Sequence, residues 1–200
     1  GIPHPLWSRG LGDVYKRQEF RLIRGDFLKL DLNSVFGTNS FSIIGNFPYN
    51  ISSQIVFKVL DNKTQIPFFA GMFQKEVAQR IAEGPGSRTY GILSVLLQTY
   101  YDIEYLFTVD EDAFDPPPRV KSGVIRLLRN DMIDPGCSFL HLKRVVKGAF
   151  NQRRKTLRNA LSSAGFAEEM IPKEFLKKRA EQLSPKEFHI LAIALIPTSS

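Results

Sequence analysis

Cysteine, histidine and long apolar runs are all scarce in this sequence, and each scarcity excludes a class of protein. The single cysteine, Cys137, cannot form a disulfide within the chain, which favours a reducing cytoplasm. The three histidines lack the spacing of metal ligands, so no metal centre is expected. The longest uninterrupted apolar run, Ile190 to Ile196, is far too short to span a bilayer. We therefore expect a cytoplasmic protein without a metal or a membrane partner, and we take it to be a monomer.

Acidic and basic residues are distributed unevenly along the 200 residues. Residues 1–118 contain 11 Lys and Arg against 13 Asp and Glu, whereas residues 119–200 contain 16 against 7. A basic excess confined to one part of a chain points to a polyanionic partner, nucleic acid first and an anionic membrane second. A solvated basic surface without any partner is the alternative.

Strand-like and helix-like patterns alternate through the first two thirds of the chain. The expected strands are residues 21–24, 41–45, 67–73, 100–109 and 120–128. The expected helices are residues 51–60, 74–84 and 92–98 and, after a boundary near 130–135, residues 139–161, 172–180 and 184–196. This order predicts an α/β sheet with an antiparallel end, followed by a separate helical part.

Composition divides the chain into three parts. Residues 1–18 are polar and unpatterned, and we expect them to be a foreign segment. Residues 19–130 form the predicted α/β domain. Residues 131–200 form a small, basic, helical domain that carries most of the positive charge.

The stretch IIGNFPYN, residues 43–50, ends an expected strand with an amide, a proline and two aromatic rings. Ile43 and Ile44 suit a strand that is covered on both faces. Open α/β sheets bind ligands at the carboxyl ends of their strands, so residues 46–49 are candidate binding residues. A strand-ending turn is the alternative, because Asn and Pro are common in turns.

Four collinear stretches resemble the small-subunit ribosomal RNA adenine N6,N6-dimethyltransferases of the KsgA type. They are IIGNFPYNISSQIVFKVL, QKEVAQRIAEGPGSRTYGILSVLLQTYY, AFDPPPRVKSGVIRL and AFNQRRKTLRNAL, within roughly residues 20–195. The resemblance implies an α/β fold with a Rossmann-like class I methyltransferase sheet and a small C-terminal α-helical domain. It also implies S-adenosyl-L-methionine as the methyl donor. The implied substrate is a pair of adjacent adenines near the 3′ end of small-subunit (16S) rRNA.

The resemblance assigns catalytic roles to residues of the NFPY motif. The Asn46 side-chain oxygen and the Phe47 carbonyl would accept the two N–H groups of an adenine amine, which positions the nitrogen for attack. Pro48 belongs to the same motif. Tyr49 would stack on the extruded base, and Phe114 of AFDPPP would close the opposite face.

The resemblance also assigns residues to the donor. Asp26 would accept a hydrogen bond from the donor's adenine amine, Phe27 would pack against that ring, and Asn46 would contribute as well. A turn residue after Gly25 is the alternative for Asp26.

A third set of residues is basic and would contact RNA phosphates. The NQRRKTLRN segment supplies Arg153, Arg154, Lys155 and Arg158, and we expect Arg154 and Arg158 to share a helical face. The predicted extension of this track is Lys75, Arg80, Arg88, Arg119 and Lys121. A solvated helix face is the alternative.

The family's Gly-rich donor loop has no counterpart ahead of Asp26. RGLGD at residues 9–13 follows no strand, and the 13 to 26 interval is too short for a strand–helix–strand unit. We therefore expect the chain to be truncated at its N-terminus, without the first strands of the sheet, and to be inactive with poor affinity for the donor. Two other functions stay open: a non-catalytic RNA-binding assembly factor of the small subunit, and a large-subunit rRNA adenine methyltransferase.

Overall fold

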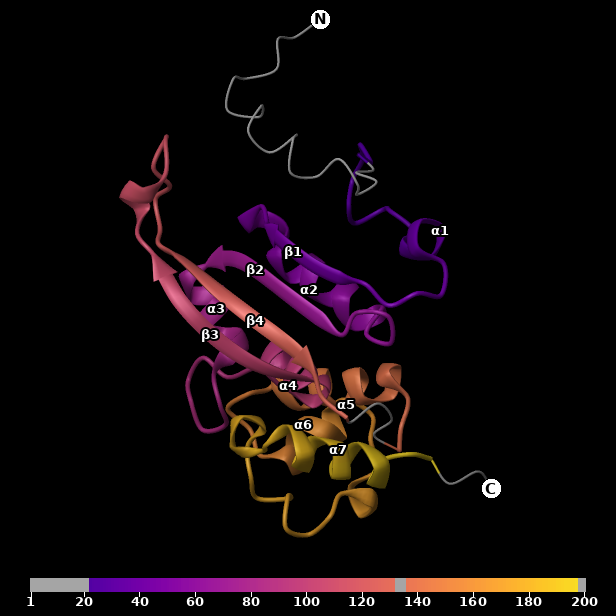
Figure 1. The fold of residues 1–200 in the computed structure, drawn as a ribbon. Helices are drawn as coiled ribbons and strands as arrows, with labels where there is room; N and C mark the ends of the chain where they lie inside the picture. Colours follow the sequence, from indigo (N-terminus) through magenta and orange to yellow (C-terminus); the bar gives the residue numbers. More distant parts are fainter. Residues whose placement is uncertain (1–21, 132–135, 198–200) are drawn as a thin grey trace, which may run out of the picture. The chain divides into compact units, whose positions relative to one another are not determined.

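The computed structural model describes residues 22–131 and 136–197 (Figure 1). The chain divides into two units, residues 1–31 and 32–200, and each is described by itself. The segment expected to be foreign, residues 1–18, lies outside the described residues, as does Arg21.

In the first unit, residues 22–24 have no regular secondary structure and residues 27–29 form a turn. The prediction of a strand at 21–24 is wrong for residues 22–24, which have no strand conformation. Asp26 organises the local backbone: its Oδ1 accepts the Leu28 N–H at 2.9 Å, and its carbonyl accepts the N–H groups of Lys29 and Leu30 at 3.1 Å. These hydrogen bonds satisfy the backbone donors of residues 28–30 within the turn that Asp26 begins.

The second unit begins with the short helix α1 (Leu32–Phe36) and contains a four-stranded sheet in the order β1–β2–β4–β3. Strand β1 (Ser42–Asn46) runs parallel to β2 (Phe68–Gln74). Strand β4 (Ser122–Arg129) is antiparallel to both β2 and β3 (Tyr101–Val109). All four strands expected in this unit are confirmed to within two residues, and so is the antiparallel end.

Three helices join the strands: α2 (Ser52–Asp61), α3 (Lys75–Ala82) and α4 (Ile92–Tyr100). Figure 1 shows them on one face of the sheet, where α3 contacts β2, β3 and β4. One face of α2 is buried, because its apolar side chains recur every three or four residues; they are Ile55, Val56, Val59 and Leu60. The Ser52 hydroxyl, at the first position of α2, donates a hydrogen bond backward to the Tyr49 carbonyl at 2.9 Å.

Strand β1 is exposed on one face, which contradicts the expectation that both isoleucines are covered. The Ile44 side chain is 77% exposed, whereas Ile43 is half-buried. Among the described strands β1 pairs with β2 alone, so it forms an edge of the sheet.

The C-terminal region contains α5 (Phe139–Asn151), α6 (Leu157–Ser163) and α7 (Pro185–Ala194). The helix expected at 139–161 is therefore interrupted between α5 and α6. Helices α5 and α7 pack against α4. The division into an α/β domain and a helical domain near residues 130–135, part of which lies outside the described residues, stays a prediction.

The prediction of a helix at 172–180 is wrong. This segment forms turns that lead into the 3-10 helix η5 (Ala180–Gln182). Its Lys178 and Leu176 carbonyls accept the N–H groups of Leu157 at 2.8 Å and Arg158 at 3.3 Å. Those carbonyls satisfy the first turn of α6 instead of forming helical hydrogen bonds of their own. Within the described ranges, every helix is too short or too polar to cross a lipid bilayer.

Candidate functional site

The NFPY motif lines an open pocket at the carboxyl end of β1. The pocket has a volume of about 350 Å³, and its lining consists of Asn46, Phe47, Pro48, Tyr49, Phe114, Pro116 and Pro118. The second wall comes from the segment between η3 (Glu111–Ala113) and β4. The structure thus brings together all five residues predicted to be catalytic, although what they do there stays a prediction.

The Phe47 ring anchors the motif to the core. It stacks on Phe69 and Phe73, with ring centroids 5.3 and 5.5 Å away. Gly45 and Gly71 are directly paired in the β1–β2 register, and a Cβ on them would lie 2.8 and 2.6 Å from the Phe47 ring. Since real Cβ atoms do not approach so closely, the two glycines form the slot in which the ring lies.

Tyr49 is held at two points. Its hydroxyl forms a 2.5 Å hydrogen bond with the Ser122 hydroxyl, and its carbonyl accepts the Ser52 hydroxyl at 2.9 Å. Ser122 is fully buried at the first position of β4. The sequence analysis missed Ser122, although a serine at the start of a strand that follows three prolines is the kind of buried polar residue that needs a partner.

Asn46 presents its amide at the rim of this pocket. The residue is exposed, and no hydrogen bond within residues 22–131 and 136–197 engages its side chain. The strand beneath it is fixed, because the Phe47 N–H donates to the Met72 carbonyl at 3.4 Å. Both the oxygen and the NH₂ group of this amide are therefore available to a ligand.

The two other residues predicted to bind the donor, Asp26 and Phe27, belong to the first unit. Asp26 is exposed and Phe27 is half-buried. The Asp26 Oδ1 closes the local turn, as the turn alternative predicts. A role toward the donor stays a prediction for both residues.

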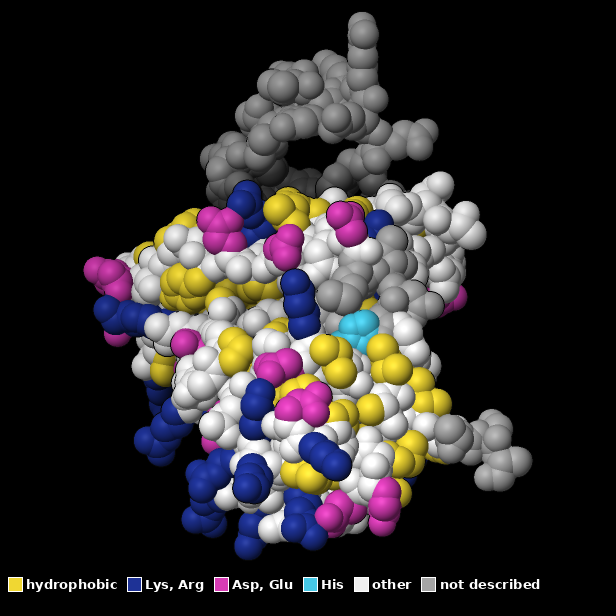
Figure 2. Space-filling view, turned by 90° about the horizontal axis from the view of Figure 1, so that it is seen from below, with side chains coloured by type: hydrophobic (Ala, Val, Ile, Leu, Met, Phe, Trp, Pro, Cys, Tyr) yellow, Lys and Arg dark blue, Asp and Glu magenta, His cyan; other side chains and the backbone are white. Residues whose placement is uncertain are grey.

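Three of the predicted RNA-binding residues line one pocket. Arg80, Arg88 and Arg153 surround a hollow of about 670 Å³ between α3, the loop after it and α5, together with Lys147, which the sequence analysis missed. Arg153 also lines an adjoining pocket of about 400 Å³ with Arg154 and Lys155. Figure 2 views the molecule from the side of the C-terminal helices, where Lys and Arg side chains gather toward one border.

The remaining predicted RNA-binding residues are spread out, and one expected relation between them is wrong. Arg154 lies in the turn after α5 and Arg158 lies in α6, so they do not share a face of one helix. The reason is the interruption at residues 152–156. Arg158 pairs with Glu168 at 2.8 Å.

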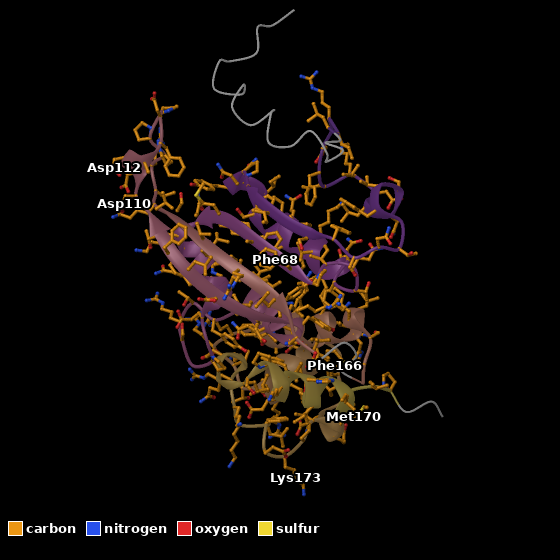
Figure 3. All side chains as sticks on the ribbon, viewed as in Figure 1. Phe68, Asp110, Asp112, Phe166, Met170 and Lys173 are labelled. Carbon is orange, nitrogen blue, oxygen red and sulfur yellow. The ribbon has the colours of Figure 1, made fainter. Side chains whose placement is uncertain are left out.

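Lys75, Arg119 and Lys121 lie near the end of the β3–β4 hairpin, whose acidic tip carries Asp110 and Asp112 (Figure 3). Lys121 pairs with Asp110 at 2.6 Å. This hydrogen bond and the attraction between the charges lower the pKa of Asp110 and raise the pKa of Lys121. The Lys75 N–H donates to the Lys121 carbonyl at 2.9 Å, and the Arg119 side chain is exposed.

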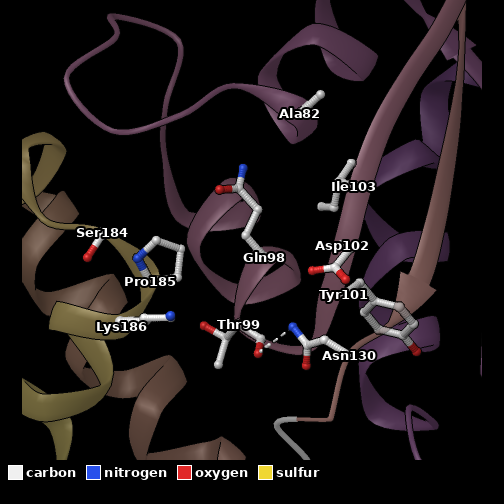
Figure 4. A pocket seen from close by; sticks show the side chains of 10 residues that line it. All are labelled: Ala82, Gln98, Thr99, Tyr101, Asp102, Ile103, Asn130, Ser184, Pro185 and Lys186. Carbon is white, nitrogen blue, oxygen red and sulfur yellow. Dashed lines mark hydrogen bonds between the residues drawn. The ribbon is translucent and has the colours of Figure 1, made fainter.

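A further pocket of about 480 Å³ lies between α4, β3 and the start of α7 (Figure 4). Asn130 donates to the Thr99 carbonyl there at 3.4 Å. None of the residues predicted to form a site lines it.

Two solved structures share this arrangement of strands and helices. A dimethyladenosine transferase from Plasmodium falciparum matches with a TM-score of 0.66 at 21% identity, covering 76% of this chain and 66% of that one. The 23S rRNA methyltransferase ErmE matches with a TM-score of 0.63 at 21% identity, covering 86% of this chain and 70% of that one. At such identity the likeness establishes the fold alone, which is that of the Rossmann-like methyltransferases.

Sequence comparison places the chain more narrowly. The model of the family described as "Ribosomal RNA adenine dimethylase" matches residues 11–196. The "Ribosomal RNA small subunit methyltransferase A" of Parabacteroides distasonis is 58% identical over 171 residues, which cover 84% of this chain and 63% of that relative. The chain therefore belongs to the ribosomal RNA adenine dimethylase family, and it spans 63% of that relative's length.

Proposed function

We propose that this protein is an rRNA (adenine-N6,N6-)-dimethyltransferase that modifies two adjacent adenines near the 3′ end of small-subunit rRNA. One observation supports this more than any other. The available amide of Asn46 and the rings of Tyr49 and Phe114 line the same pocket at the carboxyl end of β1. This is the edge at which open α/β sheets bind their ligands.

The Asn46 amide and its neighbouring backbone would activate the target nitrogen. An adenine amine is a poor nucleophile because its lone pair is delocalised into the ring. When the Asn46 oxygen and the Phe47 carbonyl each accept one N–H, the lone pair is localised and aimed, which is a positioning and electrostatic effect. No strong base is needed, since the nitrogen becomes acidic once it is methylated and releases its proton to water.

The aromatic walls would hold the extruded base. Tyr49 would stack on one face and Phe114 on the other, and such stacking contributes about 1–3 kcal/mol per base. The hydrogen bond to Ser122 already fixes the Tyr49 ring, so less side-chain entropy is lost when a base binds.

S-adenosyl-L-methionine, when bound, supplies a methyl group on a sulfonium. Asn46 fits such a donor because its amide is exposed and has no partner among the described residues. Asp26 would accept a hydrogen bond from the adenine amine of the methyl donor through the carboxylate oxygen that does not close the turn. Phe27 would pack against the adenine ring of the donor.

The test is methyl transfer to unmethylated small subunits, read as dimethyladenosine by mass spectrometry. It uses this chain and a chimera that places the preceding residues of the Parabacteroides relative ahead of residue 22. We expect product from the chimera and a loss of about 100-fold or more in Asn46→Ala, since loss of one positioned polar contact typically costs this much. Asn50→Ala is the matched control, because Asn50 is exposed beside the motif but does not line the pocket. Equal activity of the Asn46→Ala variant would overturn the assigned role.

A non-catalytic RNA-binding assembly factor is the second candidate. It is favoured by the basic pocket of Arg80, Arg88 and Arg153, which lies apart from the NFPY pocket and needs no donor. Binding of small-subunit rRNA without any transfer, in the chimera as well, would support it. Dimethyladenosine in large-subunit rRNA would instead support the large-subunit methyltransferase alternative.

A further inference from the structure

Helix α5 presents three cations that belong to neither the NFPY pocket nor the predicted RNA-binding set. Arg144 and Lys147 are exposed and Lys143 is half-buried. Residues three and four apart share a helix face, so Lys147 is a neighbour of both others. In the part of the chain that the structure describes, no ion pair involves any of the three.

These cations continue the pocket of Arg80, Arg88 and Arg153. Lys147 lines that pocket and also a second one, of about 710 Å³, which contains Lys143 and Arg144. We name the joined surface the α5 groove; its cations are Arg80, Arg88, Lys143, Arg144, Lys147 and Arg153. Its two linings contain a single carboxylate, Glu76, which is paired with Arg80 at 2.8 Å, and Glu181, outside the linings, pairs with Arg153 at 3.8 Å. The groove therefore keeps a strong positive excess.

Aromatic rings hold several of these cations at the groove. The Lys143 Nζ lies 4.6 Å from the Phe57 ring centroid, and the Arg144 Cζ lies 5.0 Å from that of Phe166. Exposed cation–π contacts contribute about 0.5–1 kcal/mol each. They restrict the long side chains before a ligand arrives, so a smaller entropy cost remains to be met on binding.

We propose that the α5 groove binds consecutive phosphates of an RNA backbone. Four residues of an α-helix rise about 6 Å, so Lys143 and Lys147 present charges at a separation comparable with that of neighbouring phosphates. The three α5 cations, which have no ion pair among the described residues, give contacts that read charge and shape rather than sequence. The groove also adjoins the Arg153–Lys155 pocket, which makes one longer binding surface. This inference rests on the proposed function, because it assigns a second contact surface for the same rRNA.

Salt-dependent binding of the whole chain tests the groove without any donor. The probe is a fluorescein-labelled hairpin from the 3′ end of small-subunit rRNA, titrated by anisotropy between 50 and 300 mM KCl. Each lost phosphate contact reduces the magnitude of the negative slope of log K against log salt by about 0.7–0.9, so Lys143→Gln/Arg144→Gln/Lys147→Gln should reduce it by about 2–3. The same loss of counterion release predicts binding about 40- to 300-fold weaker near 150 mM salt.

Two variants serve as controls. Lys173→Gln/Lys177→Gln/Lys186→Gln removes the same charge from exposed lysines outside the groove, and Figure 3 shows Lys173 at the far end of the C-terminal region. This variant should keep the slope, and Lys143→Arg/Lys147→Arg, which keeps the charge, should bind like the unmodified chain. Circular dichroism checks that all variants fold.

Three outcomes would overturn the groove while leaving the proposed function intact. The first is an unchanged salt slope in the α5 variant, and the second is an equal fall of the slope in the Lys173 control. The third is that the α5 variant keeps its affinity for RNA but no longer binds vesicles with 30% phosphatidylserine, to which the unmodified chain binds. Failure of the unmodified chain to bind the hairpin counts against the proposed function itself.

Discussion

Substituting Gly71 by Ala should displace the Phe47 ring and destabilise the protein. The added Cβ would lie 2.6 and 2.9 Å from two ring carbons of Phe47 and 3.1 Å from the Phe69 ring. The shortest of these is about 1 Å below an ordinary carbon–carbon contact of about 3.5–4.0 Å. The ring cannot retreat easily, because Phe69 and Phe73 are fully buried against it.

Overpacking of this kind costs typically about 1–3 kcal/mol. In a chain of this size that corresponds to a fall of about 2–12 °C in the thermal midpoint. The measurement is thermal unfolding by circular dichroism, with urea unfolding as a second readout. Phe47→Leu in the Gly71→Ala background should recover part of the loss, because the smaller side chain leaves room for the methyl group.

Gly84→Ala is the matched control for this experiment. A Cβ at Gly84 meets nothing within 4 Å, so its midpoint should stay within about 2 °C of the unmodified protein. Two results would contradict this prediction: the same thermal midpoint for Gly71→Ala and Gly84→Ala, or no rise of the Gly71→Ala midpoint when Phe47→Leu is added. Either would mean that the Phe47 ring does not lie on the glycine pair.

The remaining predictions concern two hydrogen-bonded pairs. Tyr49→Phe and Ser122→Ala should each lower the free energy of unfolding by about 0.5–1.5 kcal/mol, measured by urea unfolding. The double variant should lose little more than the less stable single variant, because both substitutions remove the same hydrogen bond. Additive losses would contradict the pairing. The Lys178 hydrogen bond and the Ser184 N–H lower the pKa of Glu187 below its ordinary value. Stability from this carboxylate is therefore fully present above the unfolded pKa and is lost as pH falls through the lower folded pKa. Glu187→Gln should remove that acid-dependent part, measured as urea midpoints between pH 6 and pH 3; an unchanged pH profile would refute it.

The strands of the sheet were largely predictable because each depends on local sequence. The apolar segments around Ile43 and Phe69 specify strands wherever they occur, and the parallel β1–β2 pair follows from the helix between them. The meeting of the NFPY motif with Phe114 was predictable only through the family resemblance. No periodicity in the sequence links two segments so far apart.

The helix expected at 172–180 failed because its backbone carbonyls form hydrogen bonds with a distant part of the chain. Residues 172–180 have helix-forming side chains, yet their carbonyls satisfy the first turn of α6. Intrinsic helix propensity amounts to a few tenths of a kcal/mol per residue, so such tertiary bonds override it. The α5 groove was missed for a different reason: the sequence alone does not distinguish Lys143 and Lys147 from lysines on any solvated helix face, because it does not show which carboxylates lie near them.

The NFPY pocket depends on three strands rather than on one loop. In the sheet β2 lies between β1 and β4, so the Tyr49–Ser122 hydrogen bond joins the end of β1 to the start of β4 across the end of β2. A slip of one residue in the β2–β4 register would turn Ser122 to the opposite face and release Tyr49. The glycine slot fixes the β1–β2 side through Phe47, and the buried serine fixes the β4 side. Because both anchors act on one tetrapeptide, loosening either should misplace the Asn46 amide even though neither anchor touches it.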